Sequence, residues 1–380
     1  MRINSLRYKD KIQEWELPKI DFFNLTLLVG ISGVGKTQIL NSILKIKNIA
    51  NGKSLNGVEW DISFTNEEKK YKWKGEYEIL DNIKDSYLLI QEDEESVKPK
   101  LIKESVFLEG KLIASRESND ITFQGTKMPK LASEESVISI FKEEDNFKAA
   151  YDGFKKIVFR DHTQKEGSIH FRMFDSKKIK SKYKSVEDIR NSDLDTTQKL
   201  SCLYENQQDS FNEIVESYKD VFPQVESVKI EPVIDEDMPR FLADLPIIQF
   251  KEKGVEKWIL QNRMSSGMFR TFLHISEMHL LSEGTIVLID EFENSLGVNC
   301  IDVLTEDLIF ENTRLQFIAT SHHPYIINKI PYEFWKIVTR KGGKTTAFNA
   351  KEFDLGESNH ERFMNLINLP QYKSGIQSFS

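Results

Sequence analysis

Cysteines are scarce in this sequence, and long apolar runs are missing from it. Only Cys202 and Cys300 occur among 380 residues, and neither has other metal ligands at a suitable spacing, which argues against a disulfide framework or a zinc site. No uncharged apolar run is long enough for a membrane-spanning helix, and residues 1–10 lack the apolar segment of a secretory signal. We therefore expect a cytoplasmic protein with no membrane partner.

Basic residues are outnumbered by acidic residues. The chain has 52 lysines and arginines against 60 aspartates and glutamates, which gives a formal net charge of −8. This balance argues against a surface that binds nucleic acid over its whole extent, although one local basic face remains open. The lysine-rich run at residues 177–184 has two interpretations, a solvated face or a contact with phosphates or a partner.

Apolar patterns predict strands and helices along most of the chain. Residues 25–29 are typical of a strand buried on both faces, and apolar residues at helical spacing follow from Thr37. Alternating patterns between residues 58 and 123 predict antiparallel hairpins, with one turn at Glu109-Gly110-Lys111. Further strands are expected at residues 154–160, 258–260, 285–289, 315–319 and 334–339, and helices at residues 200–222, 265–281 and 301–308.

The segment between the first apolar strand and its helix matches the phosphate-binding pattern G-x-x-x-x-G-K-[ST] in full. Its residues are Gly30, Ile31, Ser32, Gly33, Val34, Gly35, Lys36 and Thr37. Glycines let the backbone wrap phosphates closely, the helix N-terminus offers unpaired N–H groups, Lys36 reaches the terminal phosphates, and the Thr37 hydroxyl coordinates Mg²⁺. The alternative, a chance glycine-rich turn, does not account for the strand before it and the helix after it.

Two later strands end in side chains that suit nucleotide hydrolysis. Asp290 and Glu291 follow four apolar residues, and strand ends are where the sites of parallel sheets lie. Asp290 would hold Mg²⁺, and Glu291 would polarise the attacking water. His322 follows the strand at residues 315–319 and could sense the γ-phosphate, with a structural histidine as the alternative.

A serine-glycine segment precedes the acidic pair and opens a predicted helix. Its residues are Ser265, Ser266 and Gly267, which alone would be an ordinary N-cap. Together with residues 30–37, the acidic pair and His322, this segment resembles the ABC-type ATPases, specifically their OLD, RecF and SMC-like branch. The resemblance spans most of the chain. It implies that the three residues contact, in trans, the γ-phosphate of ATP held by a second copy.

The motifs and the predicted elements together indicate an α/β fold of the P-loop NTPase class. The resemblance makes it an ABC-type ATPase head with an antiparallel β subdomain and a mainly helical insertion. Four parts are expected: the N-terminal part of the head, the insertion, the C-terminal part of the head and a tail, at residues 1–161, 162–250, 251–345 and 346–380.

Some positions depart from the family pattern or are harder to assign. Met268 stands where glutamine or glutamate is usual after the signature, and Gly297 stands where His-Pro or Asp is expected. Gln124, at the end of a predicted strand, is our choice for the Q-loop glutamine over the glutamine at position 91. Tyr8 or Arg7 could stack on adenine, with exposed side chains of an edge strand as the alternative.

The resemblance implies an ATP-driven switch that works as a homodimer or a higher homo-oligomer. ATP would join two heads, hydrolysis would separate them, and a separate effector protein, such as a nuclease, would read the difference in a phage-defence operon. The segment after Pro324 carries acids without buried-strand neighbours, so no nuclease module is expected there: Glu352, Asp354, Glu357 and Glu361. The alternatives are a RecF-like repair ATPase with nucleic acid as its partner, and an ATP-binding scaffold with little hydrolysis.

Overall fold

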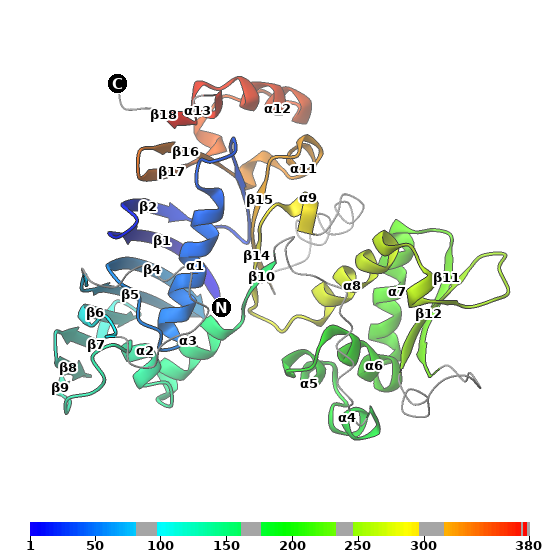
Figure 1. The fold of residues 1–380 in the computed structure, drawn as a ribbon, viewed down its shortest axis with the longest axis horizontal. Helices are drawn as coiled ribbons and strands as arrows, with labels where there is room; N and C mark the ends of the chain where they lie inside the picture. Colours follow the sequence, from blue (N-terminus) through cyan, green and yellow to red (C-terminus); the bar gives the residue numbers. More distant parts are fainter. Residues whose placement is uncertain (81–96, 161–175, 233–245, 296–314, 374, 378–380) are drawn as a thin grey trace. The chain divides into compact units, whose positions relative to one another are not determined.

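The computed structural model describes residues 1–80, 97–160, 176–232, 246–295, 315–373 and 375–377, whose elements are labelled in Figure 1. The chain divides into two compact units. The first comprises Met1–Asp161, Gly284–Phe292 and Thr313–Ser380, and the second comprises His162–Glu283 and Glu293–Asn312. We expected the chain to return to the ATPase head at residue 251, whereas in the structure it remains in the second unit until Glu283. The helix expected at residues 301–308 lies outside the described residues.

The first unit is built on one large sheet whose core is parallel. In spatial order these parallel strands are β10 (Ile157–Arg160), β14 (Ile286–Ile289), β15 (Gln316–Ser321), β3 (Leu25–Val29) and β16 (Trp335–Lys341). Every residue of β14, β15 and β3 is buried, as expected for apolar strands covered on both faces. The strands predicted at residues 25–29, 285–289, 315–319 and 334–339 are therefore confirmed.

The sheet continues from β16 into a mainly antiparallel part, which confirms the predicted hairpins. The strands follow in the order β17 (Lys344–Asn349), β2 (Trp15–Asp21), β1 (Arg2–Asp10), β4 (Val58–Asn66), β5 (Lys69–Tyr77), β6 (Leu101–Leu108), β7 (Lys111–Glu117), β8 (Asp120–Phe123) and β9 (Thr126–Lys127). Glu109 and Gly110 form the predicted turn, both with positive φ angles (48° and 76°), as the tight hairpin turn requires.

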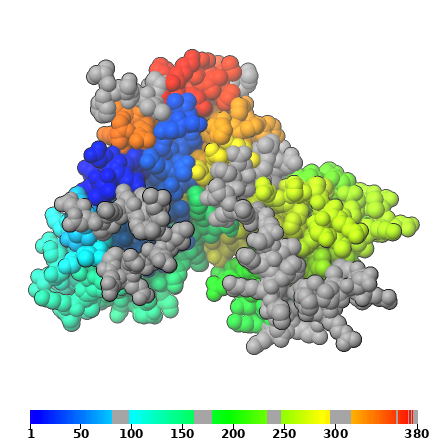
Figure 2. Space-filling model, in the orientation of Figure 1, coloured from blue at the N-terminus to red at the C-terminus, as the bar shows by residue number. Residues whose placement is uncertain are grey.

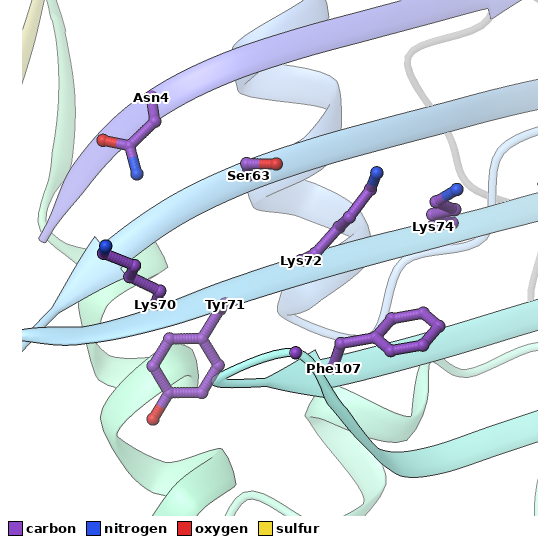
Figure 3. Close-up of a pocket in the computed structure, with 8 residues that line it drawn as sticks. Asn4, Ser63, Lys70, Tyr71, Lys72, Lys74 and Phe107 are labelled. Atoms are coloured by element: carbon purple, nitrogen blue, oxygen red, sulfur yellow. The ribbon is translucent and has the colours of Figure 1, made fainter.

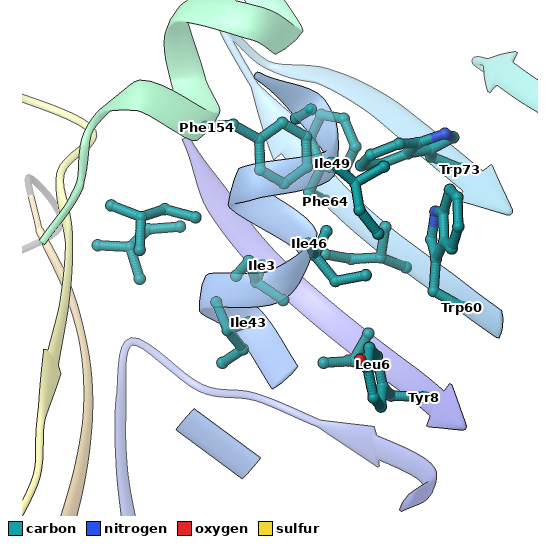
Figure 4. Packing of buried hydrophobic residues seen from close by; sticks show 14 of the residues in the cluster. Ile3, Leu6, Tyr8, Ile43, Ile46, Ile49, Trp60, Phe64, Trp73 and Phe154 are labelled. Atoms are coloured by element: carbon teal, nitrogen blue, oxygen red, sulfur yellow. The ribbon is translucent and has the colours of Figure 1, made fainter. Parts of the chain in front are cut away.

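Three helices cover one face of this antiparallel part: α1 (Lys36–Ala50), α2 (Val137–Ile140) and α3 (Asp145–Lys155). Figure 4 shows isoleucines of α1 packed among aromatic side chains of β4 and β5. Ile43, Ile46 and Ile49 are each 0% exposed, and burial of such a side chain stabilises the fold by about 1.5–3 kcal/mol. The strand expected from residue 154 begins later, because Phe154 ends up in α3, with its ring 5.4 Å from that of Trp73.

The second unit has its own core of helices and a small sheet. Its helices are α4 (Ser176–Lys182), α5 (Val186–Asn191), α6 (Thr196–Asn206), α7 (Gln208–Val221) and α8 (Ser266–Leu280), and its antiparallel strands are β11 (Val225–Glu231), β12 (Ile247–Glu252) and β13 (Ile259–Leu260). One expectation needs correction, because the helix expected at residues 200–222 is broken at Gln207 (φ −144°, ψ 65°). The insertion is mainly helical, as expected, and also carries β11 and β12. Helix α8 stays in this unit because Phe272 packs against Tyr218 and Phe250, each at a ring distance of 5.2 Å.

The C-terminal segment returns to the first unit. Its elements are α11 (Pro324–Lys329), α12 (Asn359–Asn368), α13 (Pro370–Lys373) and β18 (Ile376–Gln377), with β18 parallel to β16. In the space-filling view α12 and α13 lie next to α11 and the β16–β17 hairpin (Figure 2). Two of the tail acids stabilise local structure. Glu352 accepts a hydrogen bond from the Asn349 N–H, and Glu361 accepts one from the Glu357 N–H. None of the described helices is long and apolar enough to cross a membrane.

Candidate nucleotide-binding site

The carboxyl ends of β14, β15 and β3 lie side by side at one edge of the sheet. Ile289 pairs with Ala319, and Ser321 pairs with Val29. The residues that follow these positions therefore meet at the same edge, which is where open α/β sheets bind ligands. Gly30, Asp290 and His322 each follow one of these strands, so the sheet brings the three predicted motifs of the first unit together.

The loop of residues 30–37 has a backbone that glycine makes accessible. Gly33 and Gly35 have φ angles of 86° and 95°, a region that other residues rarely adopt. Helix α1 begins directly after Gly35, and no side chain caps its first N–H groups. Such a helix end, with its positive dipole, suits a phosphate group.

Lys36 lies folded back over its own loop. Its Nζ donates to the carbonyl oxygens of Gly30 (2.7 Å) and Ile31 (3.0 Å). These contacts hold the ammonium group at the start of the loop, close to the N–H groups of α1. The loop therefore combines a fixed positive charge with backbone donors, which is the chemistry that binds phosphate.

Thr37 and Asp290 form a pair of oxygen ligands. The Thr37 Oγ1 lies 3.1 Å and 3.0 Å from the two carboxylate oxygens of Asp290, which is 9% exposed. A hydroxyl and one carboxylate beside a phosphate loop fit Mg²⁺, which prefers oxygen ligands, retains several waters and takes the remainder from the substrate phosphates. No cluster of three or more His, Cys, Asp or Glu side chains with metal-ligand geometry occurs among the described residues, and a magnesium site of this kind needs none.

Thr320, at the end of β15, was missed by the sequence analysis. Its hydroxyl donates to Asp290 Oδ1 (2.7 Å) and accepts from the Glu291 N–H (2.8 Å), and its side chain is buried. Glu291 itself has φ 48°, although it is neither a glycine nor part of a hairpin. Thr320 thus fixes the acidic pair from the neighbouring strand. The available signal was its position directly before Ser321-His322, at a buried strand end.

The adjacent histidines His322 and His323 lie in different surroundings. His322 directly follows β15 and is exposed, whereas the ring of His323 accepts from the Tyr325 N–H (3.3 Å) and caps α11. His322 is therefore at the surface of the sheet edge that carries the phosphate loop.

Ser265, Ser266 and Gly267 belong to the second unit and are exposed. Ser265 is the N-cap of α8, and its Oγ accepts from the Met268 N–H (3.2 Å). A Cβ added at Gly267 would meet no atom within 4 Å. The start of a 15-residue helix is thus open to a ligand or a second copy.

The structure does not bring Gln124 to the phosphate loop. Gln124 (φ 48°) and Gly125 (φ 79°) form the exposed turn between β8 and β9, at the end of the sheet remote from β3. Tyr8 is also unsuited to stacking on adenine, because it is only 1% exposed and its ring lies 5.7 Å from that of Trp15. Arg7 is exposed and pairs with Glu59 at 3.3 Å. Strand β1 lies between β2 and β4, so neither residue is on an edge strand.

We expect Thr320→Val to weaken the acidic pair, because valine keeps the shape of threonine but cannot hydrogen-bond Asp290 or Glu291. The free energy of unfolding should fall by about 1–3 kcal/mol, the cost of a buried unpaired donor. Nucleotide binding should also need a higher Mg²⁺ concentration. Denaturant unfolding and a Mg²⁺ titration measure these effects, with Thr320→Ser as the control that keeps the hydroxyl. A valine variant with wild-type stability and wild-type Mg²⁺ response would contradict this role.

Comparisons with solved structures found SMC head domains. An Smc head bound to the C-terminal winged-helix domain of ScpA has a TM-score of 0.49 and 14% identity, with 92% of this chain and 98% of that chain covered. An Smc head with an extended coiled coil, bound to a ScpA domain derived from Pyrococcus furiosus, has a TM-score of 0.47 and 13% identity, with 92% and 97% covered. The SMC head of Thermotoga maritima has a TM-score of 0.42 and 14% identity, with 92% and 99% covered.

A search of curated protein sequences found no match. A family model described as "AAA domain, putative AbiEii toxin, Type IV TA system" matches residues 25–328. This range begins at β3 and ends within α11, so it contains the phosphate loop, the signature segment, the acidic pair and His322. The chain therefore belongs to this AAA family, and its fold is that of an ABC-type P-loop ATPase.

Proposed function

We propose that this protein is a Mg²⁺-dependent ATPase that pairs with a second copy around ATP and acts as a switch for a separate effector. The observation that carries the proposal is the cluster of Thr37, Asp290 and Thr320 beside the phosphate loop. It joins an oxygen ligand set for Mg²⁺ to the helix end that suits phosphate. The same strand end supplies a second carboxylate, Glu291, as a base.

Each residue has one task in this mechanism. Lys36 and the N–H groups at the start of α1 would neutralise and hold the phosphates, and Thr37 and Asp290 would hold Mg²⁺. The metal ion would withdraw charge from the phosphate oxygens during hydrolysis. Glu291 would accept a proton from the attacking water, and His322 would contact the γ-phosphate from the end of β15.

Pairing would complete the site. In the ABC-type ATPases that this chain resembles, the signature segment of one copy contacts ATP in the other, and Ser265, Ser266 and Gly267 are exposed as that contact requires. ATP would then favour the paired state, and hydrolysis would release it. The family description names a "putative AbiEii toxin" of a type IV toxin–antitoxin system, which supports a role in such a system, whereas the separate effector rests on the resemblance to the ABC-type ATPases.

Replacement of Lys36 by alanine should abolish ATP binding or weaken it severely, because the positive charge at the start of the loop is lost. Isothermal titration with ATP and Mg²⁺ measures the affinity. Lys45→Ala, on the same helix but paired with Asp10 at 2.8 Å, is the matched control and should bind ATP normally. Equal ATP affinity in a folded Lys36→Ala protein and in the wild type would contradict the assignment of residues 30–37 as the ATP-binding loop.

Glu291→Gln should retain ATP and accumulate the paired state, because only the base is lost. Ser266→Arg should bind ATP but fail to pair or hydrolyse it, since a large side chain would block the exposed start of α8. Mass photometry with and without ATP measures pairing, and phosphate release measures turnover. Glu283→Gln, an exposed acid that precedes β14, is the control. One mass distribution for all variants in both conditions argues against pairing, and a wild type that binds ATP without turnover favours the scaffold alternative.

One further observation favours the nucleic-acid alternative. A groove of about 440 Å³ lies on the antiparallel part of the sheet, and Lys70, Lys72 and Lys74 follow one another along β5 at its side (Figure 3). Alternation along the strand places the three lysines on one face, with successive Cα atoms about 7 Å apart. Phe107 of β6 lines the same groove, and an aromatic ring beside lysines suits a single-stranded nucleic acid. Asp61 offsets part of this charge, since it lies 3.7 Å from Lys72 and 3.3 Å from Lys74.

Charge reversal of these three lysines to glutamate should abolish binding of a single-stranded oligonucleotide at low salt, while ATP binding stays unchanged. Each phosphate contact contributes about 0.7 to the slope of log affinity against log salt, so fluorescence anisotropy across a salt series counts the contacts. The control reverses three exposed lysines elsewhere in the first unit, Lys19, Lys148 and Lys351. No binding by the wild type, or an equal loss in the control, would remove this alternative.

A further inference from the structure

Thr345, on β17, lies against the phosphate loop and is 0% exposed. Its Oγ1 lies 2.9 Å from the Trp15 Nε1 and 3.3 Å from the Val34 carbonyl oxygen. An indole N–H can only donate, and a carbonyl oxygen can only accept. The threonine hydroxyl therefore accepts from Trp15, which leaves its own hydrogen for Val34.

The bond to Val34 has a consequence for the next N–H group in the loop. A trans peptide is planar, with its C=O and N–H pointing in opposite directions. When Thr345 holds the Val34 carbonyl toward β17, the Gly35 N–H of the same peptide must point away from β17. Gly35 immediately precedes α1, where P-loops present their N–H groups to phosphate.

We propose that Thr345 is a positioning residue that orients the Gly35 N–H for the nucleotide phosphates. The proposal rests on the ATP-binding function proposed above. Thr345 would not touch the nucleotide itself. It would act through the Val34–Gly35 peptide, which it fixes before ATP arrives and so spares the loop an ordering step on binding.

Packing around the loop supports this role. A Cβ at Gly35 would lie 2.6 Å from the Thr345 Oγ1 and 3.3 Å from its Cγ2, so the threonine side chain fills the space beside that glycine. At the other end of the loop, a Cβ at Gly30 would lie 2.7 Å from the Val338 carbonyl oxygen on β16. The β16–β17 hairpin thus contacts both ends of the loop, and Thr345 makes the hydrogen bond.

Trp15 fixes the orientation of the threonine in turn. It is 4% exposed and begins β2, and the next residue, Glu16, donates its N–H to the Gly343 carbonyl oxygen (2.9 Å) at the tip of the β16–β17 hairpin. The indole is therefore held by backbone pairing on the strand beside β17. The indole N–H cannot accept a hydrogen bond. If the hydroxyl hydrogen of Thr345 turned from Val34 toward Trp15, it would therefore lose its acceptor.

The test compares Thr345→Val, which keeps the shape and loses the hydroxyl, with Thr345→Ser, which keeps the hydroxyl. Thr26→Val is the matched control, because Thr26 is 0% exposed and its hydroxyl accepts from the Phe23 N–H (2.9 Å) away from the loop. Amide hydrogen exchange of the loop peptide in the nucleotide-free protein reports its order directly. ATP affinity and steady-state kinetics report the effect on binding.

We expect Thr345→Val to speed exchange in the loop and to raise both the ATP dissociation constant and KM roughly two- to tenfold, the effect of one hydrogen bond, with kcat nearly unchanged. Thr345→Ser should resemble the wild type, and Thr26→Val should lower thermal stability only. If Thr345→Val does not fold, Trp15→Phe, which removes the N–H donor together with part of the indole ring, should give the same exchange and affinity changes. Wild-type loop exchange and wild-type affinity in a folded valine variant, or an equal effect of serine and valine, would overturn the proposal. A wild-type protein that does not bind ATP would instead refute the proposed function, whatever the exchange result.

Discussion

The parallel register of β14, β15 and β3 is the constraint on which the candidate site depends. It places Ile289 opposite Ala319 and Ser321 opposite Val29, so that the chain leaves all three strands at one edge. A shift by one residue would turn each side chain to the other face of the sheet. The Asp290 carboxylate could then no longer accept hydrogen bonds from Thr37 and Thr320 together. The register of these buried strands therefore serves the chemistry, because it decides which side chains meet at the sheet edge.

Helix α1 connects that sheet edge to the core of the first unit. Its first turn contains Lys36 and Thr37, and its later turns carry isoleucines buried against β1, β4 and β5. Close-packed interiors transmit small displacements rather than absorb them. The position of the N–H groups at the start of α1 therefore depends on aromatic side chains such as Trp60 and Trp73, which lie in the antiparallel part.

The sequence predicted the parts of the site that are set by local requirements. The glycines of the phosphate loop and the acids after an apolar strand could be recognised from the residues next to them in the sequence. Both lie at the ends of the predicted strands, as expected. Thr320 and Thr345 depend on partners that lie 30 and 311 residues away. For Thr320 the only signal was its position before Ser321-His322 at a strand end, and Thr345 had no distinctive pattern. Gln124 was misassigned because a strand that ends at a binding edge and a strand that ends in a hairpin turn have similar sequences. The glycine after Gln124 was the signal for a turn. The alternating residues of β11 were a strand signal in a segment that we interpreted as mainly helical.

Backbone strain singles out Glu291 within this arrangement. Among the described residues, the other non-glycine residues with positive φ occupy hairpin turns, where that conformation is required: Glu14, Glu67, Glu68, Glu109, Ser118 and Gln124. Glu291 instead joins β14 to the short helix α9 (Phe292–Ser295), where a glycine would avoid the strain. Such a conformation persists when its surroundings over-determine it, and here the Thr320 hydroxyl accepts from the Glu291 N–H while it donates to Asp290. The Thr320 hydroxyl oxygen thus couples the candidate metal ligand, Asp290, to the candidate base, Glu291. A shift of the Asp290 carboxylate on metal binding would therefore change the hydrogen bond to the Glu291 N–H.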